Sequence, residues 1–368
     1  MAKHVIKTIL INLLVLFIVI TLNFFLPRLI FEDPATPYYI GVPEDAYLLR
    51  AQIRAEYGFD KPVIVQYFFY LGRILTLDFG YSYQYKEEVL NVIFAKVPWS
   101  LFINLTSLLI AVSLGILIGA KCAKNRGKKL DNAILKINSV LTSVPTFWLA
   151  LIIVLLFSFL MPLFPYIGSM TPGYTLVVNT TVFIILISIF TISAILVLIF
   201  FKKSLWALII FLAGLYISML SSIQIADTID ILYHSVLPLF VVSIGAIFSQ
   251  SMNVRNYMLN VVDEDYAMFA RAKGMPERRI LYGHTLRNAL LPLVTTLGMN
   301  FVGLFSGSVL IEKIFSWPGM GSLLVDANNN GDYQLAQAIL LIFAIITIVA
   351  NTLTDMIYHK LDPRVSTR

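Results

Sequence analysis

Long apolar blocks separated by shorter polar segments dominate this chain. A helix needs about 20 predominantly apolar residues to cross the hydrocarbon core of a bilayer. Eight blocks meet this requirement, and none of them contains Asp, Glu, Lys, Arg or His. They are Thr8–Leu26, Trp99–Ala120, Ser139–Phe164, Val177–Phe201, Leu205–Ile225, Val236–Asn253, Ala289–Leu310 and Leu335–Thr354. The pattern predicts an all-α, polytopic membrane protein with eight spans.

The composition agrees with this fold class. Of the 368 residues, 58% are hydrophobic and 13% are charged, whereas soluble domains carry about 25% charged residues. A soluble domain of this composition could not cover its own core, so soluble enzymes, disordered proteins and nucleic-acid-binding proteins are excluded. The single cysteine, Cys122, excludes an intramolecular disulfide and any multi-cysteine metal site.

The positions of Lys and Arg predict the orientation. If the N-terminus is cytoplasmic, 19 of the 27 basic residues lie in cytoplasmic segments, and most others lie in one long loop, Pro27–Pro98. Long loops follow the positive-inside rule weakly, whereas short loops follow it well. We therefore expect both termini to be cytoplasmic. Pro27 and Arg28 follow the first block where a cleavage site would need small residues, so this block is read as a retained anchor.

Three parts of the chain are expected: a tail and first span (1–30), a structured extracytoplasmic loop (31–98) and a transmembrane domain (99–368). Within the loop, Asp45–Glu56 has the apolar spacing of a helix, and Gly58 follows its end. Ten aromatic residues lie between Tyr57 and Tyr85. They indicate either a surface for an external partner or, as we favour, an aromatic belt at the level of the lipid headgroups.

The most informative segment is the cytoplasmic loop Arg255–Arg287. Three acidic residues, Asp263–Asp265, stand at the start of a helical stretch, and Arg271 and Lys273 stand at its end, as the helix dipole favours. Gly274 is suited to the cap that ends this helix. A first short helix is therefore predicted to end at Gly274.

Pro276 and Glu277 are typical of the first turn of a second helix. Two short helices outside the membrane bury little of themselves, so we expect them to dock into a cytoplasmic partner. A solvated basic connector would explain Arg278 and Arg279 through the positive-inside rule. It would not explain the order of helix, capped turn and helix.

These residues resemble the coupling-helix motif of binding-protein-dependent ABC importer permeases, in particular the dipeptide/oligopeptide/nickel branch and its oligopeptide permease B-type subunit. The segments that carry the resemblance are Asp265–Gly274, Glu277–Leu281 and His284–Pro292, supported by Tyr57–Pro62, Asp78–Ser82, Glu312–Gly321 and Leu361–Arg364.

Two features depart from the family pattern. The broader motif has Glu-Ala-Ala where this chain has Met268-Phe269-Ala270, as is usual in the peptide branch. Val177–Ile225 adds two spans where the family typically has none, so six core spans are expected beside them. Because two spans are added, every later segment stays on the same side of the membrane as in the family pattern. The added spans could be lipid-facing padding or a docking site for an accessory protein.

The resemblance implies a permease subunit of the cell membrane that imports short peptides by alternating access. It implies pairing with a second permease, two cytoplasmic ATPase subunits and an extracytoplasmic binding protein. ATP and Mg would be bound by the ATPases, and this chain would be non-catalytic, without cofactor or metal. Nickel, a metallophore or another small solute remains an alternative cargo, and a non-transporting receptor or scaffold is a less favoured alternative.

The same resemblance assigns coupling to seven residues near the turn. A side chain at Gly274 is expected to tilt the second helix and to abolish transport without preventing insertion. The expected docking residues are Ala270, Arg271, Ala272, Lys273 and Gly274, with Asp265 and Tyr266 in support.

The sequence contains no motif that would indicate a different activity. A P-loop is missing, and so are the His-Glu-x-x-His and Gly-x-Ser-x-Gly motifs. The predicted spans lack the charged residue that ion-coupled transporters keep at depth. Pro145, Pro238 and Pro292, with the pattern Gly303-x-x-x-Gly307, are read as features of helix packing, or alternatively as bends in a gated pathway.

Overall fold

The computed structural model describes residues 2–30, 47–56, 58–172, 225–262, 264–290, 292–293 and 307–361, with six single residues between 210 and 304. Most of these residues are helical, which confirms the helical fold class. The chain forms two compact units, Met1–Val97 with Gly319–Thr352 and Pro98–Pro318 with Leu353–Arg368. The expected extra spans within Val177–Ile225 lie outside the described residues apart from a few single positions.

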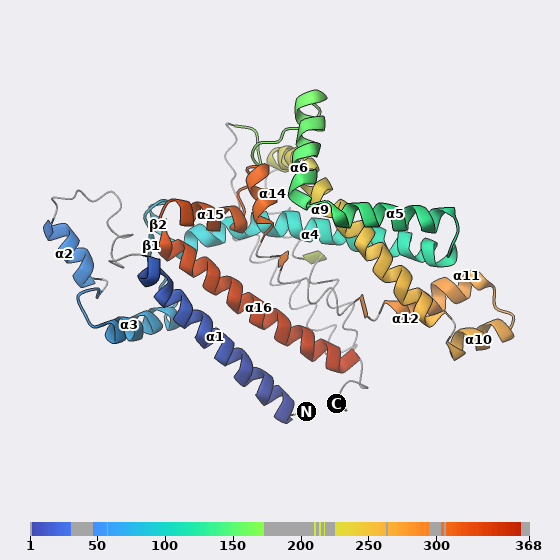
Figure 1. Cartoon of the computed structure of the whole chain (residues 1–368), viewed down its shortest axis with the longest axis horizontal. Helices are drawn as coiled ribbons and strands as arrows, with labels where there is room; N and C mark the ends of the chain where they lie inside the picture. Colours follow the sequence, from blue (N-terminus) through green and yellow to red (C-terminus); the bar gives the residue numbers. More distant parts are fainter. Residues whose placement is uncertain are drawn as a thin grey trace. The chain divides into compact units, whose positions relative to one another are not determined.

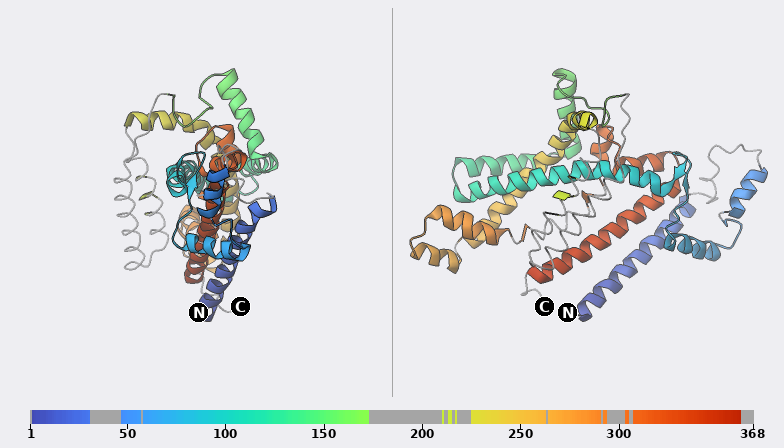
Figure 2. Two further views of the ribbon diagram at one scale, coloured as in Figure 1. Left: turned by 90° about the vertical axis from the view of Figure 1, so that its left-hand side faces the viewer. Right: turned by 180° about the vertical axis from the view of Figure 1, so that it is seen from behind.

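In the first unit, the first and last helices of the chain run side by side (Figure 2). Asn12 Nδ2 donates to Thr352 Oγ1 over 2.7 Å, and the amide groups of Asn23 and Gln337 each donate to the other residue's carbonyl oxygen. Polar pairs of this kind hold apolar helices together where water is absent. The unit contains α1 (Ala2–Ile30), α2 (Tyr47–Glu56), α3 (Val63–Leu75), α15 (Met320–Asn329), the start of α4 (Val89–Lys124) and most of α16 (Tyr333–Leu361).

A small hairpin closes the core of the first unit. Its strands β1 (Tyr81–Ser82) and β2 (Glu87–Glu88) are antiparallel, with Tyr81 opposite Glu88. The Ser82 hydroxyl is buried and donates to Asp332 Oδ2, while Asp332 Oδ1 accepts the Leu335 N–H at the start of α16. One carboxylate therefore joins the hairpin to a helix start. The apolar core beneath it contains Val89, Val92, Ile93, Met320, Leu323, Leu335 and Ile339.

In the second unit, α4 and α9 (Ile225–Val261) approach closely through two glycines of α4. A Cβ added at Gly115 would lie 2.7 Å from Gln250 Cβ, and one added at Gly119 would lie 2.5 Å from the Ser251 carbonyl oxygen. Any side chain at these positions would force the helices apart. The unit contains the rest of α4 with α5 (Lys129–Ser143), α6 (Thr146–Val154), a π-helical turn (Leu155–Leu160), α9 (Ile225–Val261), α10 (Asp265–Ala272), α11 (Glu277–Arg279), a second π-helical turn (Ile280–Thr285), α12 (Leu286–Ala289) and α14 (Val309–Ile314), as Figure 1 shows.

The prediction that Ser139–Phe164 forms a single span of one continuous helix is wrong. The chain bends by 96° between α5 and α6. Val144 is extended, with φ −94° and ψ 125°, and Pro145 precedes the first residue of α6. A residue before proline is pushed away from the helical region, which explains why the helix stops here. Pro238, by contrast, lies inside the continuous helix α9.

The expected span Ala289–Leu310 also fails to continue as one helix to its end. Gly307 has φ +70°, a left-handed conformation, and α14 begins at Val309. The absence of a side chain at Gly307 leaves room for the buried carboxylate of Glu312, which accepts a 2.6 Å hydrogen bond from Ser100 Oγ. Gly307 therefore makes space for a buried carboxylate.

Three described helices are long and apolar enough to cross a membrane: Val89–Lys124, Asp227–Val261 and Tyr333–Thr352. The bent pair α5 and α6 would add a fourth if it forms one broken span. In α1, the stretch Leu10–Phe25, whose side chains are described, is apolar as well. These helices confirm a multi-pass membrane protein.

Asp332→Ala removes the acceptor for both Ser82 and the start of α16. Loss of a cap costs about 1 kcal/mol, and a buried hydroxyl left without its partner costs about 1–3 kcal/mol. We expect a lower melting temperature for the purified variant in detergent, while Asp60→Ala, at an exposed position of the same unit, leaves it unchanged. Equal melting temperatures for both variants would show that the Asp332 contacts do not stabilise the unit.

Candidate functional site

The helix–turn–helix expected in the loop Arg255–Arg287 is present in the structure. α9 ends at Val261, α10 begins at Asp265, and a second helical segment runs from Glu277 to Ala289 as α11, a π-helical turn and α12. We name residues 265–289 the coupling element. Asp263 lies outside the described residues.

Gly274 ends the first helix as its position predicts. Its φ of +73° is left-handed. The Gly274 N–H donates to the Arg271 carbonyl oxygen over 2.9 Å, and the Met275 N–H donates to that of Ala270 over 3.2 Å. These bonds satisfy carbonyl groups that the helix end would leave free. A Cβ at Gly274 would meet no atom within 4 Å, so the conformation alone disfavours a side chain here.

The Arg271 side chain forms hydrogen bonds with residues on both sides of the turn. Its Nη2 and Nε atoms donate to the two carboxylate oxygens of Glu277 over 2.9 and 3.2 Å, and its Nη1 atom donates to the Val262 carbonyl oxygen. The guanidinium therefore touches the end of α9, the end of α10 and the start of α11. Its hydrogen bonds lower the pKa of Glu277 below the ordinary value, so this carboxylate is charged at neutral pH.

The two helices of the coupling element share a small apolar interior. Ala267, Ala270 and Ile280 are buried against one another, with Tyr266 and Met275 packed beside them. The small alanine side chains let α10 lie close to the second segment. Ala270, expected as a docking residue, therefore faces the interior of the element. The Tyr266 hydroxyl donates to the Val261 carbonyl oxygen over 3.1 Å, which ties α10 to α9.

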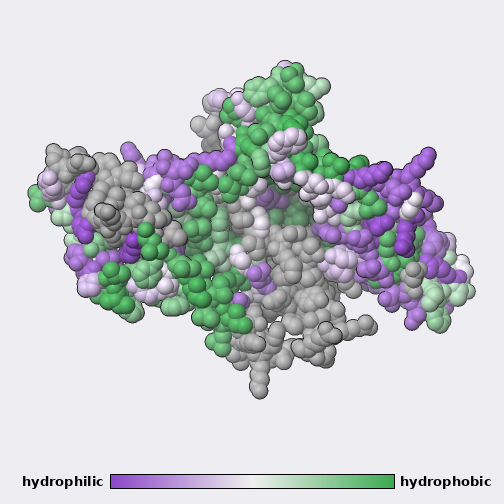
Figure 3. All heavy atoms as spheres, viewed as in Figure 1, coloured by the Kyte–Doolittle hydropathy of each residue, from purple (hydrophilic) through white to green (hydrophobic). Residues whose placement is uncertain are grey.

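The outward surface of α10 is apolar at its centre. Met268 is 53% exposed and Phe269 is 70% exposed, and Asp265, Ala272 and Lys273 are exposed around them. Hydrophilic residues dominate the surrounding surface over α5, α10 and α11, at the right in Figure 3. Met268 and Phe269 are thus two large apolar side chains exposed together within a hydrophilic surface.

The second segment anchors the element to the long helices. Leu281, Ala289 and Leu293 form one buried cluster with Val254 and Met258 of α9 and Ala120 of α4. Ile280, the residue before Leu281, belongs to the interior of the coupling element. The adjacent residues Ile280 and Leu281 thus face two different apolar clusters, one inside the coupling element and one shared with α9 and α4.

An ion pair between Arg255 and the buried carboxylate of Asp131 joins α9 to α5 just before the coupling element. Asp131 has no exposed surface, and both of its carboxylate oxygens accept hydrogen bonds from Arg255, with 2.7 Å between Arg255 Nη2 and Oδ2. The Gly127 N–H donates to the same carboxylate over 2.9 Å. This bidentate geometry fixes both the distance and the angle between the two helices.

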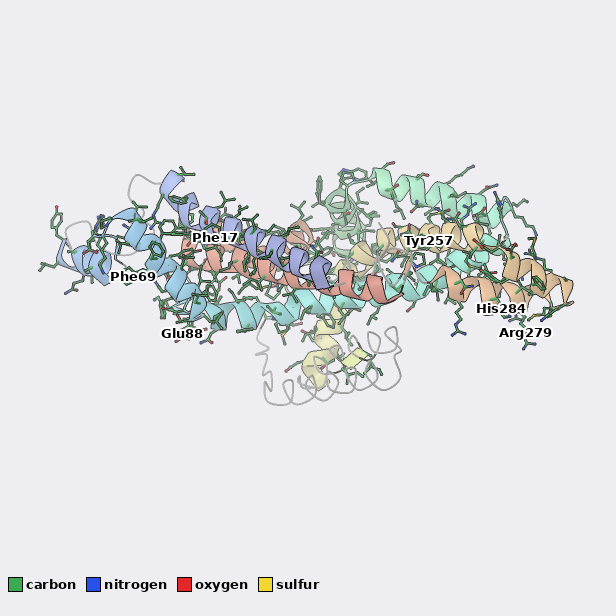
Figure 4. The ribbon with its side chains drawn as sticks, turned by 90° about the horizontal axis from the view of Figure 1, so that it is seen from below. Phe17, Phe69, Glu88, Tyr257, Arg279 and His284 are labelled. Carbon is green, nitrogen blue, oxygen red and sulfur yellow. The ribbon has the colours of Figure 1, made fainter. Side chains whose placement is uncertain are left out.

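A basic hollow lies beside the second segment. Lys124, Arg278, Arg279 and Tyr282 line it together with Pro276 and Gly283. The Arg279 side chain projects from α11 in Figure 4. Within the described residues, no three His, Cys, Asp or Glu side chains gather in a way that could hold a metal ion.

Sequence comparison identifies the family. Residues 174–367 match the model described as "Binding-protein-dependent transport system inner membrane component", and residues 1–104 match the model of the N-terminal part of such components. The chain belongs to this family. It is therefore a permease subunit, a non-catalytic component of a multi-pass membrane transport system.

Several permeases of named systems are similar to this chain along almost its whole length. The oligopeptide transport system permease protein AppB of Bacillus subtilis is 30% identical over 366 residues, which is 99% of each chain. OppB of Haemophilus influenzae, also an oligopeptide permease, is 30% identical with the same coverage. The di/tripeptide permease DppB of Pseudomonas aeruginosa is 30% identical over 94% of this chain and 93% of its own.

Sequence reasoning missed two parts of the site in this permease. Met268 and Phe269 were noted only as a departure from the family motif, although they lie on the exposed side of α10. Asp131 and Arg255 were not paired. Asp131 is the single acidic residue in the basic segment Lys121–Lys136, and this isolation was the available signal.

Arg255→Ala should destabilise the permease strongly because Asp131 would stay buried without its cation. Removing one partner of a buried pair costs about 3–5 kcal/mol, whereas exposed pairs contribute about 0–1 kcal/mol. Arg73→Ala, which breaks the exposed pair with Asp78, is the matched control. We expect a much larger fall in melting temperature for Arg255→Ala, and partial recovery in Asp131→Ala/Arg255→Ala. Equal falls for the two single variants would contradict the role assigned to the buried pair.

Gly274→Val tests the turn. A left-handed conformation costs a residue with a side chain about 1–2 kcal/mol, and a β-branched residue adopts it least readily. Gly58→Val is the control, because Gly58 also has a positive φ (+70°) and a Cβ there would meet only the Lys61 side chain, in ordinary contact at 3.9 Å. We expect both variants to insert into the membrane and only Gly274→Val to lose substrate uptake in cells. Normal uptake by Gly274→Val would contradict this account of the turn.

Proposed function

We propose that this permease forms half of the translocation path of an ATP-driven importer of short peptides, and that α10 docks into a cytoplasmic ATPase subunit. The peptide substrate is supported by its relatives, which are named as oligopeptide and dipeptide permeases. Docking is supported by the outward pair Met268 and Phe269 on a short, braced helix. This pair is the observation that carries the proposal.

The proposed topology has eight spans with both termini in the cytoplasm. The distribution of Lys and Arg supports it, since 19 of 27 lie on the side assigned to the cytoplasm. The coupling element then lies on the same side as the termini, where an ATPase can reach it. The membrane is the cell membrane, in keeping with the inner membrane components of the family.

Met268 and Phe269 have the character of docking anchors. A short amphipathic helix commonly binds by placing a few apolar side chains in a groove of its partner. Large side chains at the centre of a contact contribute most of the binding energy, and polar residues around them exclude water. Lys273 and Asp265 would form such a polar rim. ATP and Mg would be bound by the ATPase and not by this chain.

The packing of the element suggests how ATP binding would drive transport. Two ATPases that close on ATP would displace the two docked α10 helices of the paired permeases. Leu281 and Ala289 would pass this displacement to α9 and α4, and the path would switch from inward-open to outward-open. For this to occur, the ATPase must bind the two states with different free energies. An extracytoplasmic binding protein would deliver the peptide, and the solute it holds would distinguish a peptide from nickel or another cargo.

Loss of the outward side chains should uncouple the permease from its ATPase. We expect Met268→Ala/Phe269→Ala to insert normally and to co-purify with much less ATPase in mild detergent, with uptake falling in parallel. Truncation of a hot-spot residue costs about 2 kcal/mol or more, and each 1.4 kcal/mol is about tenfold in affinity. The measurement is mass spectrometry and ATPase activity of the purified complex.

The matched control is Leu130→Ala, which shortens a 44% exposed side chain on α5, outside the coupling element. It should retain both ATPase and uptake. If Met268→Ala/Phe269→Ala retained ATPase and uptake as Leu130→Ala does, α10 would not be the docking surface. If no ATPase co-purified even with the unmodified chain, a receptor role would replace the importer proposal.

A further inference from the structure

The exposed surface of α3 is apolar, the reverse of a helix on a soluble protein. Ile64, Phe68 and Leu75 are 63%, 65% and 84% exposed, and their spacing of four and seven residues places them on one side of the helix. Gln66, a polar residue of the same helix, is 7% exposed. The apolar side of α3 is therefore turned away from the protein and its polar side toward it.

Contacts with α1 fix the depth of α3. The Tyr67 and Thr21 hydroxyls lie 2.7 Å apart, and Arg28 Nη2 donates to Gln66 Oε1 over 2.6 Å. The Phe24 ring packs edge-on against that of Tyr67, with 5.1 Å between the centroids. These partners lie where the apolar run of α1 ends and its first charged residue after that run, Arg28, appears. α3 is thus held at the level where α1 reaches the membrane surface.

The exposed apolar surface continues from α1 onto α3. Leu22 and Leu29 of α1 are 62% and 85% exposed, and the Phe25 ring stacks on that of Tyr67. Phe69 on α3, labelled in Figure 4, is 52% exposed, and Lys61 Nζ lies 4.3 Å from the centre of its ring. Aromatic rings and long basic side chains in this arrangement are typical of the boundary between acyl chains and headgroups.

We propose that α3 is an interfacial helix that lies in the surface of the bilayer, with Ile64, Phe68 and Leu75 inserted at the boundary between headgroups and acyl chains. An apolar side of this kind buries itself about 5–10 Å into the interfacial region. The helix carries no acidic residue, and its one basic residue, Arg73, pairs with Asp78. The apolar stripe therefore lacks charges that would orient a protein partner. The leaflet is the outer one in the orientation proposed above.

Contact with lipid would allow α3 to position the neighbouring segments of the permease. α3 would fix the end of α1 at a set depth and hold the hairpin that follows, residues 81–88, at the membrane surface. The inference is independent of the ATPase partner. It depends only on the multi-pass membrane fold and on the contacts between α1 and α3.

Depth-dependent fluorescence quenching tests the proposal. In a Cys122→Ala background, the full-length chain with its co-purifying subunits would carry one bimane label at Ile64→Cys, Phe68→Cys or Leu75→Cys. Glu87→Cys, an exposed position on β2 of the same unit, is the control. The labelled proteins would be reconstituted in vesicles of phosphatidylethanolamine and phosphatidylglycerol that contain lipid with a doxyl group near the headgroup.

We expect the doxyl lipid to quench the labels at 64, 68 and 75 and aqueous iodide to quench the label at 87. Quenching of all four labels by iodide and of none by the doxyl lipid would overturn the proposal, because α3 would then lie in water. Protection of the α3 labels from both quenchers would also overturn it and would indicate that a second protein subunit covers the stripe.

Discussion

The contact of Ile280 with Ala267 and Ala270 is the interaction on which the coupling element depends. An isolated helix as short as α10, eight residues, is not stable in water. Packing against Ile280 gives it a fixed position, and the adjacent Leu281 belongs to the cluster that holds α9 and α4. The element is therefore packed against both long helices. This packing, together with the Tyr266 and Arg271 hydrogen bonds to the end of α9, connects α10 to the long helices.

Two ion pairs support this arrangement in different ways. The Arg271–Glu277 pair is exposed and contributes little to stability, but its geometry orients the turn around Gly274. In the Asp131–Arg255 pair the carboxylate is buried and the contact is bidentate, so it fixes the end of α9 against α5. The first pair shapes the surface offered to a partner. The second joins α9 to α5 a few residues before the coupling element begins.

Local signals in the sequence were sufficient to predict the coupling element. The acidic start, the basic end and the glycine cap of α10 act within a few residues, and the structure has this helix and turn. The same holds for α2, which ends before Gly58 as expected. The docking role of Asp265 to Gly274 remains a prediction that rests on the family, although Ala270 faces inward.

Contacts between distant parts of the chain could not be predicted in the same way. Asp131 and Arg255 are separated by 124 residues, and no local pattern brings them together. Hydropathy also predicts each span as one uninterrupted segment. In the structure the chain bends at Pro145 and leaves the helical conformation at Gly307. Proline inside α9 does not break that helix, so tertiary packing decides where a proline ends a span.

The central claim is that the exposed side of α10 binds an ATPase. The most direct test places the photo-crosslinking residue p-benzoylphenylalanine at position 269 of the full-length chain in its native membrane, with position 130 as the control. The account predicts a crosslinked product at 269 that contains a P-loop ATPase, and none at 130. A label at 269 that crosslinks only to lipid, or to a protein without a nucleotide-binding site, would contradict it.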